Sequence, residues 1–178
     1  MRIITGKARG VRLDTLSGLD TRPTAERTKE AVFSMLAFDI EGRRVLDLFS
    51  GSGQMGLEAL SRGAFSAVFV DSSKAAIYTI EENIRSCGFK DKASVYNTDY
   101  KSFLTANKNT FDIVFLDPPY KAGLMEDAIE RIAPHINENG VIVCETGSEE
   151  FLPENIEGFT SKRYKYGKIA LTVYRKGE

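Results

Sequence analysis

Residues 45–60 have the sequence VLDLFSGSGQMGLEAL, and this stretch decides the fold. Its apolar start predicts a strand, Gly-x-Gly-x-x-Gly follows, and the apolar spacing after the last glycine predicts a helix. Gly51 and Gly53 would let the backbone turn tightly and approach a ligand, and Gly56 would let the helix pack closely on the strand. A strand, a glycine-rich loop and a helix in this order are the context that a nucleotide-binding loop requires.

Strand and helix patterns alternate along the rest of the chain. We expect strands at 45–49, 67–70, 93–96, 112–116 and 141–144, and helices at 25–37, 54–62, 73–87, from 101 and at 123–133. Residues 2–13 predict a short hairpin, Thr24 is the expected N-cap of the first helix, and 159–175 predict a closing antiparallel hairpin. The alternation predicts an α/β fold, doubly wound, with a mainly parallel seven-stranded sheet and ligands at the carboxyl ends of the strands.

A second motif, Asp117-Pro118-Pro119-Tyr120, follows the apolar run over 111–116. A strand that ends in an acid, two prolines and an aromatic ring has a rigid tip with a carboxylate, free backbone carbonyls and a flat ring. That set suits the planar amino group of a nucleobase, because the acceptors hold the NH₂ and the ring stacks on the base. The alternative is an ordinary strand followed by a Pro-Pro turn.

Two further acids indicate which nucleotide the glycine-rich loop binds. Asp47 lies in the first strand close to the loop, where it would repel a pyrophosphate but attract the cationic methionine part of S-adenosylmethionine. Asp71 ends the next strand, where a carboxylate can bind both ribose hydroxyls. A nicotinamide or flavin cofactor is the alternative, but no hydride-transfer constellation is visible. The sequence therefore favours S-adenosylmethionine.

The charge of the chain is unevenly distributed. The net charge is −1, yet residues 1–45 carry +3, residues 46–159 carry −9 and residues 160–178 carry +5. Basic ends on an acidic body suggest that the ends meet a polyanion, the alternative being that they are simply solvated. The candidates for phosphate contact are Arg2, Lys7, Arg9 and Arg12 near the start of the chain, and Lys162, Arg163, Lys165 and Lys168 near its end.

Composition limits the class of protein. With 178 residues, 42% of them hydrophobic and 28% charged, the chain fits one globular domain over 1–178. No apolar run is long enough to cross a bilayer, and the amino terminus lacks the apolar core of a signal peptide. Cys87 and Cys144 form no metal-binding spacing. We therefore expect a cytoplasmic monomer with no metal and no membrane partner.

These motifs resemble those of the class I, Rossmann-like S-adenosylmethionine-dependent methyltransferases. More narrowly, the chain is similar to the bacterial RsmD-type enzymes, which methylate the N2 amine of a guanine in 16S ribosomal RNA. The similarity spans nearly the whole chain and includes the segments RIITGKARG (2–10), RPT (22–24), LDLFSGSG (46–53) and DPPY (117–120). Gln54-Met55 departs from the family, where smaller or more aliphatic residues are expected.

The resemblance implies roles for particular residues. In catalysis, Asp117 and the Pro118 carbonyl would hold the amine and Tyr120 would stack on the base. The expected cofactor-binding residues are Asp47, Gly51, Ser52, Gly53, Asp71, Asp99, Tyr100 and Thr24; the expected substrate-binding residues are Arg2, Lys7, Arg9, Arg12, Arg22 and Pro119. Two alternatives stay open: Asp99 can be a helix N-cap, and Asp47 can brace the loop through backbone amides.

The resemblance also divides the chain and names a partner. Residues 1–40 would be an extension that covers the cofactor and contacts RNA, and 41–178 the catalytic core. The partner would be ribosomal RNA, within a small-subunit particle, because an acidic body disfavours tight binding to naked RNA. One alternative is an N6-adenine methyltransferase acting on DNA or RNA, since the Asp-Pro-Pro-Tyr tip serves that chemistry too. A non-catalytic ribosome assembly factor is another, although a binding module needs neither motif.

Overall fold

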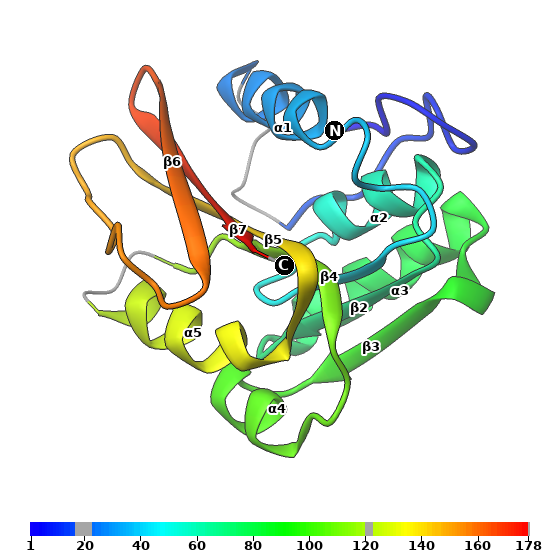
Figure 1. Cartoon of the computed structure of the whole chain (residues 1–178). Helices are drawn as coiled ribbons and strands as arrows, with labels where there is room; N and C mark the ends of the chain where they lie inside the picture. The colour runs from blue at the N-terminus through cyan, green and yellow to red at the C-terminus, as the bar shows by residue number, and fades with distance from the viewer. Residues whose placement is uncertain (17–22, 120–122, 178) are drawn as a thin grey trace.

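The computed structural model, shown in Figure 1, describes residues 1–16, 23–119 and 123–177. Within them, seven strands form one sheet in the order β3-β2-β1-β4-β5-β7-β6. The strands are β1 (Arg44–Asp47), β2 (Ser66–Asp71), β3 (Ala93–Asn97), β4 (Phe111–Leu116), β5 (Ile136–Gly147), β6 (Phe159–Tyr166) and β7 (Ile169–Lys176). Strands β1 to β5 pair in parallel, and β7 runs antiparallel between β5 and β6. The predicted sheet, with its closing antiparallel hairpin, is confirmed.

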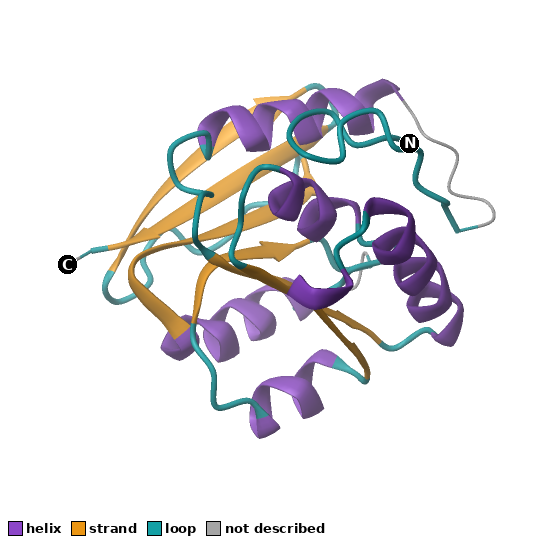
Figure 2. Cartoon of the chain, turned by 90° about the vertical axis from the view of Figure 1, so that its right-hand side faces the viewer, coloured by secondary structure: helices purple, strands orange, loops and turns teal. Residues whose placement is uncertain are grey.

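Helices cover both faces of this sheet, as Figure 2 shows. They are α1 (Pro23–Met35), α2 (Gln54–Ser61), α3 (Lys74–Cys87), α4 (Tyr100–Ala106) and α5 (Leu124–Ile132), with two short 3₁₀ helices at Lys90–Lys92 and Ala133–His135. Alternate residues of β4 pack into the two hydrophobic cores on opposite faces of the sheet. Ile113 and Phe115 belong to the core beneath α1, α2 and α3, whereas Val114 and Leu116 belong to the core beneath α4 and α5. A strand segment buried on both faces must be apolar, which explains the unbroken apolar run over 113–116 before Asp117.

Three predictions differ appreciably from the structure. Helix α1 begins at Pro23, so the prediction that Thr24 caps this helix is wrong. Proline suits the first helical position, because its fixed φ is helical and its missing N–H has no helical partner there. Strand β5 extends well beyond 141–144 at both ends. The expected hairpin over 2–13 is reduced to one antiparallel bridge between Arg2 and Arg12.

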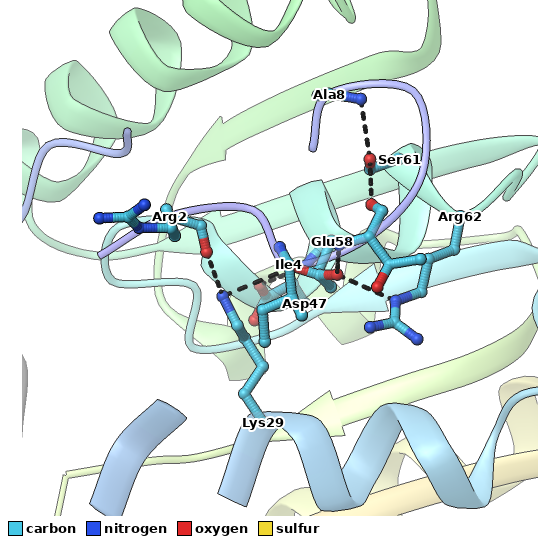
Figure 3. Close-up of polar contacts among 10 residues, drawn as sticks. Arg2, Ile4, Ala8, Lys29, Asp47, Glu58, Ser61 and Arg62 are labelled. Carbon is cyan, nitrogen blue, oxygen red and sulfur yellow. Dashed lines mark hydrogen bonds and ion pairs between the residues drawn. The ribbon is translucent and has the colours of Figure 1, made fainter. Parts of the chain in front are cut away.

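The amino-terminal segment is fixed to α2 by a buried carboxylate, Glu58, whose side chain is fully buried. Figure 3 shows how contacts converge on it. The backbone N–H of Ile4 donates to its Oε2 at 2.8 Å, and that of Thr5 to its Oε1 at 3.0 Å. Arg62 Nε lies 2.9 Å from Oε1, and Lys29 Nζ lies 3.5 Å from Oε2. One side chain therefore joins the segment, α1 and α2.

Lys29 and Ser61 complete this junction. Lys29 Nζ also donates to the carbonyl of Arg2 at 2.8 Å, and burial lowers the pKa of Lys29 although Glu58 opposes that effect. Ser61 Oγ accepts from the N–H of Ala8 at 3.0 Å and donates to the carbonyl of Thr5 at 2.6 Å. Because its polar groups are paired, this junction can be dry and rigid.

Asn83 on α3 connects the same segment to the glycine-rich loop. It is buried, and its Oδ1 accepts from the N–H of Asp14 at 2.7 Å. Its Nδ2 donates to the carbonyls of Asp14, at 3.0 Å, and Ser52, at 2.9 Å. The position of the loop is thus coupled to that of the amino-terminal segment.

Candidate active site

The glycine-rich loop leaves β1 at the carboxyl edge of the sheet. Gly51 and Gly53 have φ of 55° and 78°, a region that favours glycine. A Cβ at Gly51 would meet no atom within 4 Å, so the backbone there can be approached by a ligand. Ser50 holds the loop in place: its Oγ donates to the Asp47 carbonyl at 2.6 Å and accepts from the N–H of Val70 at 2.9 Å.

Asp47 and Asp71 hold this loop in place through hydrogen bonds to its backbone N–H groups and to those next to it. Asp47 is buried, and its Oδ2 accepts from the N–H of Gly56 at 3.1 Å. Asp71 Oδ2 accepts from the N–H of Gly51 at 2.9 Å, and its Oδ1 from that of Ser73 at 2.9 Å. The bracing alternative for Asp47 is therefore what the structure contains, and Asp71 has a similar part.

The site suits a cationic, nitrogen-rich cofactor. Burial raises the pKa of Asp47 to about 7, helped by the charges of Asp117 and Asp71. A nearby cation would reverse that rise, so a positively charged ligand and an ionised Asp47 would stabilise each other. The Oε1 atom of Gln54, at the end of the loop, is buried without a hydrogen-bond partner in the described part of the chain. It is free to accept a hydrogen bond from a ligand.

Gly56, the third glycine of the motif, packs against Phe69 of β2, and this close contact allows a prediction about stability. A Cβ on Gly56 would lie 2.4 Å from Cε1 and 2.7 Å from Cζ of the Phe69 ring. We expect Gly56→Ala to lower the free energy of unfolding by about 1–3 kcal/mol, the usual effect of overpacking. Urea denaturation measures it. Gly147→Ala is the control, since a Cβ there meets nothing within 4 Å; equal stabilities of the two variants would contradict the prediction.

The tip that follows β4 places Asp117 at the same edge of the sheet. Strands β1 and β4 are neighbours, with Asp47 opposite Phe115, so the glycine-rich loop and the tip adjoin. Asp117 and Pro119 are exposed and Pro118 is half-buried. Although Asp117 is accessible, the protein around it limits the hydration of its carboxylate and raises its pKa to about 6.

Asp99 and Tyr100 lie at the start of α4. Asp99 is exposed and caps the helix, since its Oδ1 accepts from the N–H of Ser102 at 3.0 Å; the capping alternative is thus realised, and adenine binding stays a prediction. The Tyr100 hydroxyl donates to Asp127 Oδ2 at 2.6 Å, and its ring packs on that of Phe49 at 5.3 Å. Burial and the bond to Asp127 raise the pKa of Tyr100 to about 12.

The basic candidates divide into two groups. The side chains of Arg2, Lys7, Arg9 and Arg12 are exposed, and within the described residues none of them forms an ion pair or a hydrogen bond. Near the other end, Lys168 is exposed. Lys165 pairs with Glu149 at 3.1 Å, and Arg163 donates to the Ser148 carbonyl at 2.6 Å while lying over the Phe151 ring. The amino-terminal group is the better placed for phosphates.

Three predicted site residues are not described. Tyr120 and Arg22 lie outside the described residues, as does the side chain of Thr24. In the part of the chain that is described, no group of three His, Cys, Asp or Glu residues is placed to hold a metal ion. No described helix is long and apolar enough to span a membrane.

Residues that the sequence analysis did not single out also shape the site. Glu145, near the end of β5, lies next to Asp117, and burial together with the Asp117 charge raises its pKa to about 7. Its signal was visible, because it follows an apolar strand just as Asp47, Asp71 and Asp117 do. Glu58 and Asn83 gave no comparable signal, since most of their partners are far away in the sequence.

Comparison with known proteins identifies relatives. Residues 1–175 match the family described as Conserved hypothetical protein 95. The chain is 33% identical to ribosomal RNA small subunit methyltransferase D of Escherichia coli (strain K12) over 179 residues, covering 99% of this chain and 90% of that protein. It is 37% identical to the protein of the same name from Haemophilus influenzae over 163 residues, covering 87% and 84% of the two.

Solved structures of other proteins have a similar fold. The hypothetical protein TTHA0928 of Thermus thermophilus has a TM-score of 0.82 and 31% identity, with 97% of this chain and 98% of that chain covered. The 16S rRNA N2 G1207 methyltransferase RsmC of T. thermophilus, in complex with AdoMet and guanosine, has a TM-score of 0.73. Its identity is 22%, with 90% of this chain and 45% of that chain covered, so it supports the fold alone.

The fold and the arrangement of loop and tip define a Rossmann-like methyltransferase. The order of the strands and the glycine-rich loop at the end of β1 are those of this class. Within it, the chain belongs to the Conserved hypothetical protein 95 family, the RsmD-type methyltransferases, as its motifs predicted.

Proposed function

We propose that this chain transfers a methyl group from S-adenosylmethionine to the exocyclic N2 amine of a guanine in small-subunit ribosomal RNA. The observation that carries the proposal is the pairing of β1 with β4, which brings the glycine-rich loop against the Asp117-Pro118-Pro119 tip at one edge of the sheet. A methyl donor held by the loop and an amine held by the tip would then face each other. Relatives named ribosomal RNA small subunit methyltransferase D support the choice of RNA.

The tip would make a poor nucleophile reactive. The lone pair of an aromatic amine is delocalised into the ring, so the amine must be turned towards sp³ geometry. Asp117 and the Pro118 carbonyl would accept its two hydrogens and aim the lone pair at the methyl group. The bound cofactor supplies an activated methyl group on a sulfonium. Well-oriented groups can supply roughly 7–11 kcal/mol of such an acceleration.

Asp117 is a stronger acceptor when it is ionised, and only then has it no O–H that would face the amine, so the reaction should depend on pH. Because its pKa is raised to about 6, we expect single-turnover rates to rise with pH through about 6 and then level off. Asp47 and Glu145 have pKa values near 7 and also titrate in this range. Asp117→Asn keeps an acceptor oxygen but cannot titrate, so it isolates the contribution of Asp117. If the rate falls at low pH in the same way in the wild type and in Asp117→Asn, the pH dependence does not come from Asp117.

The exposed side chains of Arg2, Lys7, Arg9 and Arg12 would contact the RNA backbone. Glu58 and Ser61 fix their segment to the catalytic core, so phosphate contacts made there can position the target base. We propose a partly or fully assembled small subunit in the cytoplasm as the substrate, because the body of the protein is acidic.

The test uses radiolabelled S-adenosylmethionine with three acceptors from a strain that lacks the activity: small ribosomal subunits, their deproteinised RNA and genomic DNA. The labelled nucleoside is identified by mass. N2-methylguanosine from the subunit is the expected result. N6-methyladenine would keep the mechanism and replace the substrate, whereas cofactor binding without any labelled acceptor would favour an assembly factor.

A further inference from the structure

Glu145 and Asp117 are neighbours across two parallel strands. The last registered pair of β4 and β5 is Leu116 with Cys144, and the residues that follow these two in the sequence are Asp117 and Glu145. Parallel strands lie about 4.8 Å apart, so the two backbones are adjacent where the carboxyl groups begin. The second acid therefore stands directly beside the one that the reaction requires.

The alternation of side chains puts Glu145 on one face of the sheet, and continued one residue beyond β4 it puts Asp117 on that face too. Phe115 on β4 and Val143 on β5, each two residues earlier, pack in the core beneath α1, α2 and α3. Side chains separated by two positions share a face. Leu171 of β7 lies directly opposite Glu145 and belongs to that same core. Glu145 thus projects towards the face of the sheet that α1, α2 and α3 cover.

Among the residues that the structure describes, no partner explains the position of the Glu145 carboxylate. It is half-buried, and within the described residues it forms no hydrogen bond and no ion pair. Its surroundings and the neighbouring Asp117 raise its pKa to about 7. Half-buried carboxyl groups with perturbed pKa values at the ligand-binding edge of a sheet mark functional positions.

The Watson–Crick edge of guanine offers what two adjacent carboxylates need. Its N2 amine and its N1–H are neighbouring donors, whereas adenine has an acceptor at N1. We propose that Glu145 accepts the N1–H of the guanine whose N2 amine Asp117 holds, and thereby selects guanine over adenine. This inference rests on the proposed function and deepens it. The same hydrogen bond would increase electron density in the ring and favour attack by the amine.

The test changes the base and the protein together. Small-subunit particles are reconstituted around RNA that carries guanine or 2-aminopurine at the labelled position. 2-Aminopurine keeps the amine but lacks the N1–H. Wild-type protein should prefer guanine at least about a hundredfold in kcat/KM. Glu145→Ala should lower kcat/KM for guanine by about tenfold to a hundredfold and leave that for 2-aminopurine nearly unchanged.

Two more variants separate recognition from structure. Glu145→Gln has an amide oxygen that can accept the N1–H, so it should keep most of the preference for guanine. Glu138→Ala removes an exposed acid at the other end of β5 and should change neither rate. Thermal melting and titration with S-adenosylmethionine check that each variant is folded.

Each result has a distinct meaning. If Glu145→Ala loses activity equally on both bases, or keeps the wild-type preference while guanine N2 is still labelled, Glu145 does not read N1–H and the inference is wrong. If wild-type protein labels no guanine at N2, the proposed function fails first and the inference fails with it.

Discussion

Replacing Asp117 by alanine is expected to lower turnover by about a hundredfold or more, with little change in the affinity for S-adenosylmethionine. The expected loss resembles that caused by removing one preorganised group that stabilises a transition state. Asp117 lies on the tip after β4, whereas the loop that would hold the cofactor follows β1 and is braced by Asp47 and Asp71. Removing Asp117 therefore leaves the cofactor loop intact.

Turnover on small subunits and calorimetric titration with the cofactor measure the two effects separately. Asp91→Ala is a suitable control, because Asp91 is exposed on the short helix between α3 and β3. Near-normal turnover of the Asp117 variant would exclude its catalytic role. A parallel loss of cofactor affinity would instead assign Asp117 to binding.

Replacing Glu58 by glutamine is expected to lower the free energy of unfolding by about 3–5 kcal/mol, as happens when one partner of a buried ion pair is removed. Lys29 would remain buried without its counter-charge, and one of the N–H groups of Ile4 and Thr5 would face an amide donor. For a chain of this length the melting temperature should fall by about 6–20 °C. The junction shown in Figure 3 would thus make a large polar contribution to stability.

Denaturation by urea, followed by circular dichroism, tests this prediction. Glu82→Gln is the matched control, because Glu82 forms an exposed ion pair with Arg85, one turn away on α3, and such pairs contribute about 0–1 kcal/mol. The double variant Lys29→Met/Glu58→Leu should regain part of the stability, since it removes the buried charge of Lys29 together with that of Glu58. The recovery should stay incomplete, because Arg62 and the N–H groups of Ile4 and Thr5 still lose their acceptor. A Glu58→Gln variant as stable as the wild type would show that the junction is not needed.

Much of the fold could be predicted from the sequence. Hydrophobic periodicity located the five parallel strands and five helices, and the two motifs follow β1 and β4 at the carboxyl edge of the sheet, as predicted. The errors fell at boundaries, such as β5 and the start of α1, where pairing with neighbouring strands or a proline decides where an element begins. The sequence left two roles open for Asp99, helix N-cap and cofactor-binding residue, because one acid before a helix can serve either purpose. In the structure Asp99 caps α4.

The sequence by itself determined the glycine-rich loop and the Asp-Pro-Pro-Tyr tip, because both depend on the conformational freedom or rigidity of residues adjacent in the chain. Only the tertiary structure decided that Glu145 stands beside Asp117 and that Glu58 joins the first residues of the chain to Lys29 and Arg62. Those contacts depend on the order and register of strands and on helix packing. The free energy that fixes them comes from burying surfaces far apart in the sequence, which no local pattern reports.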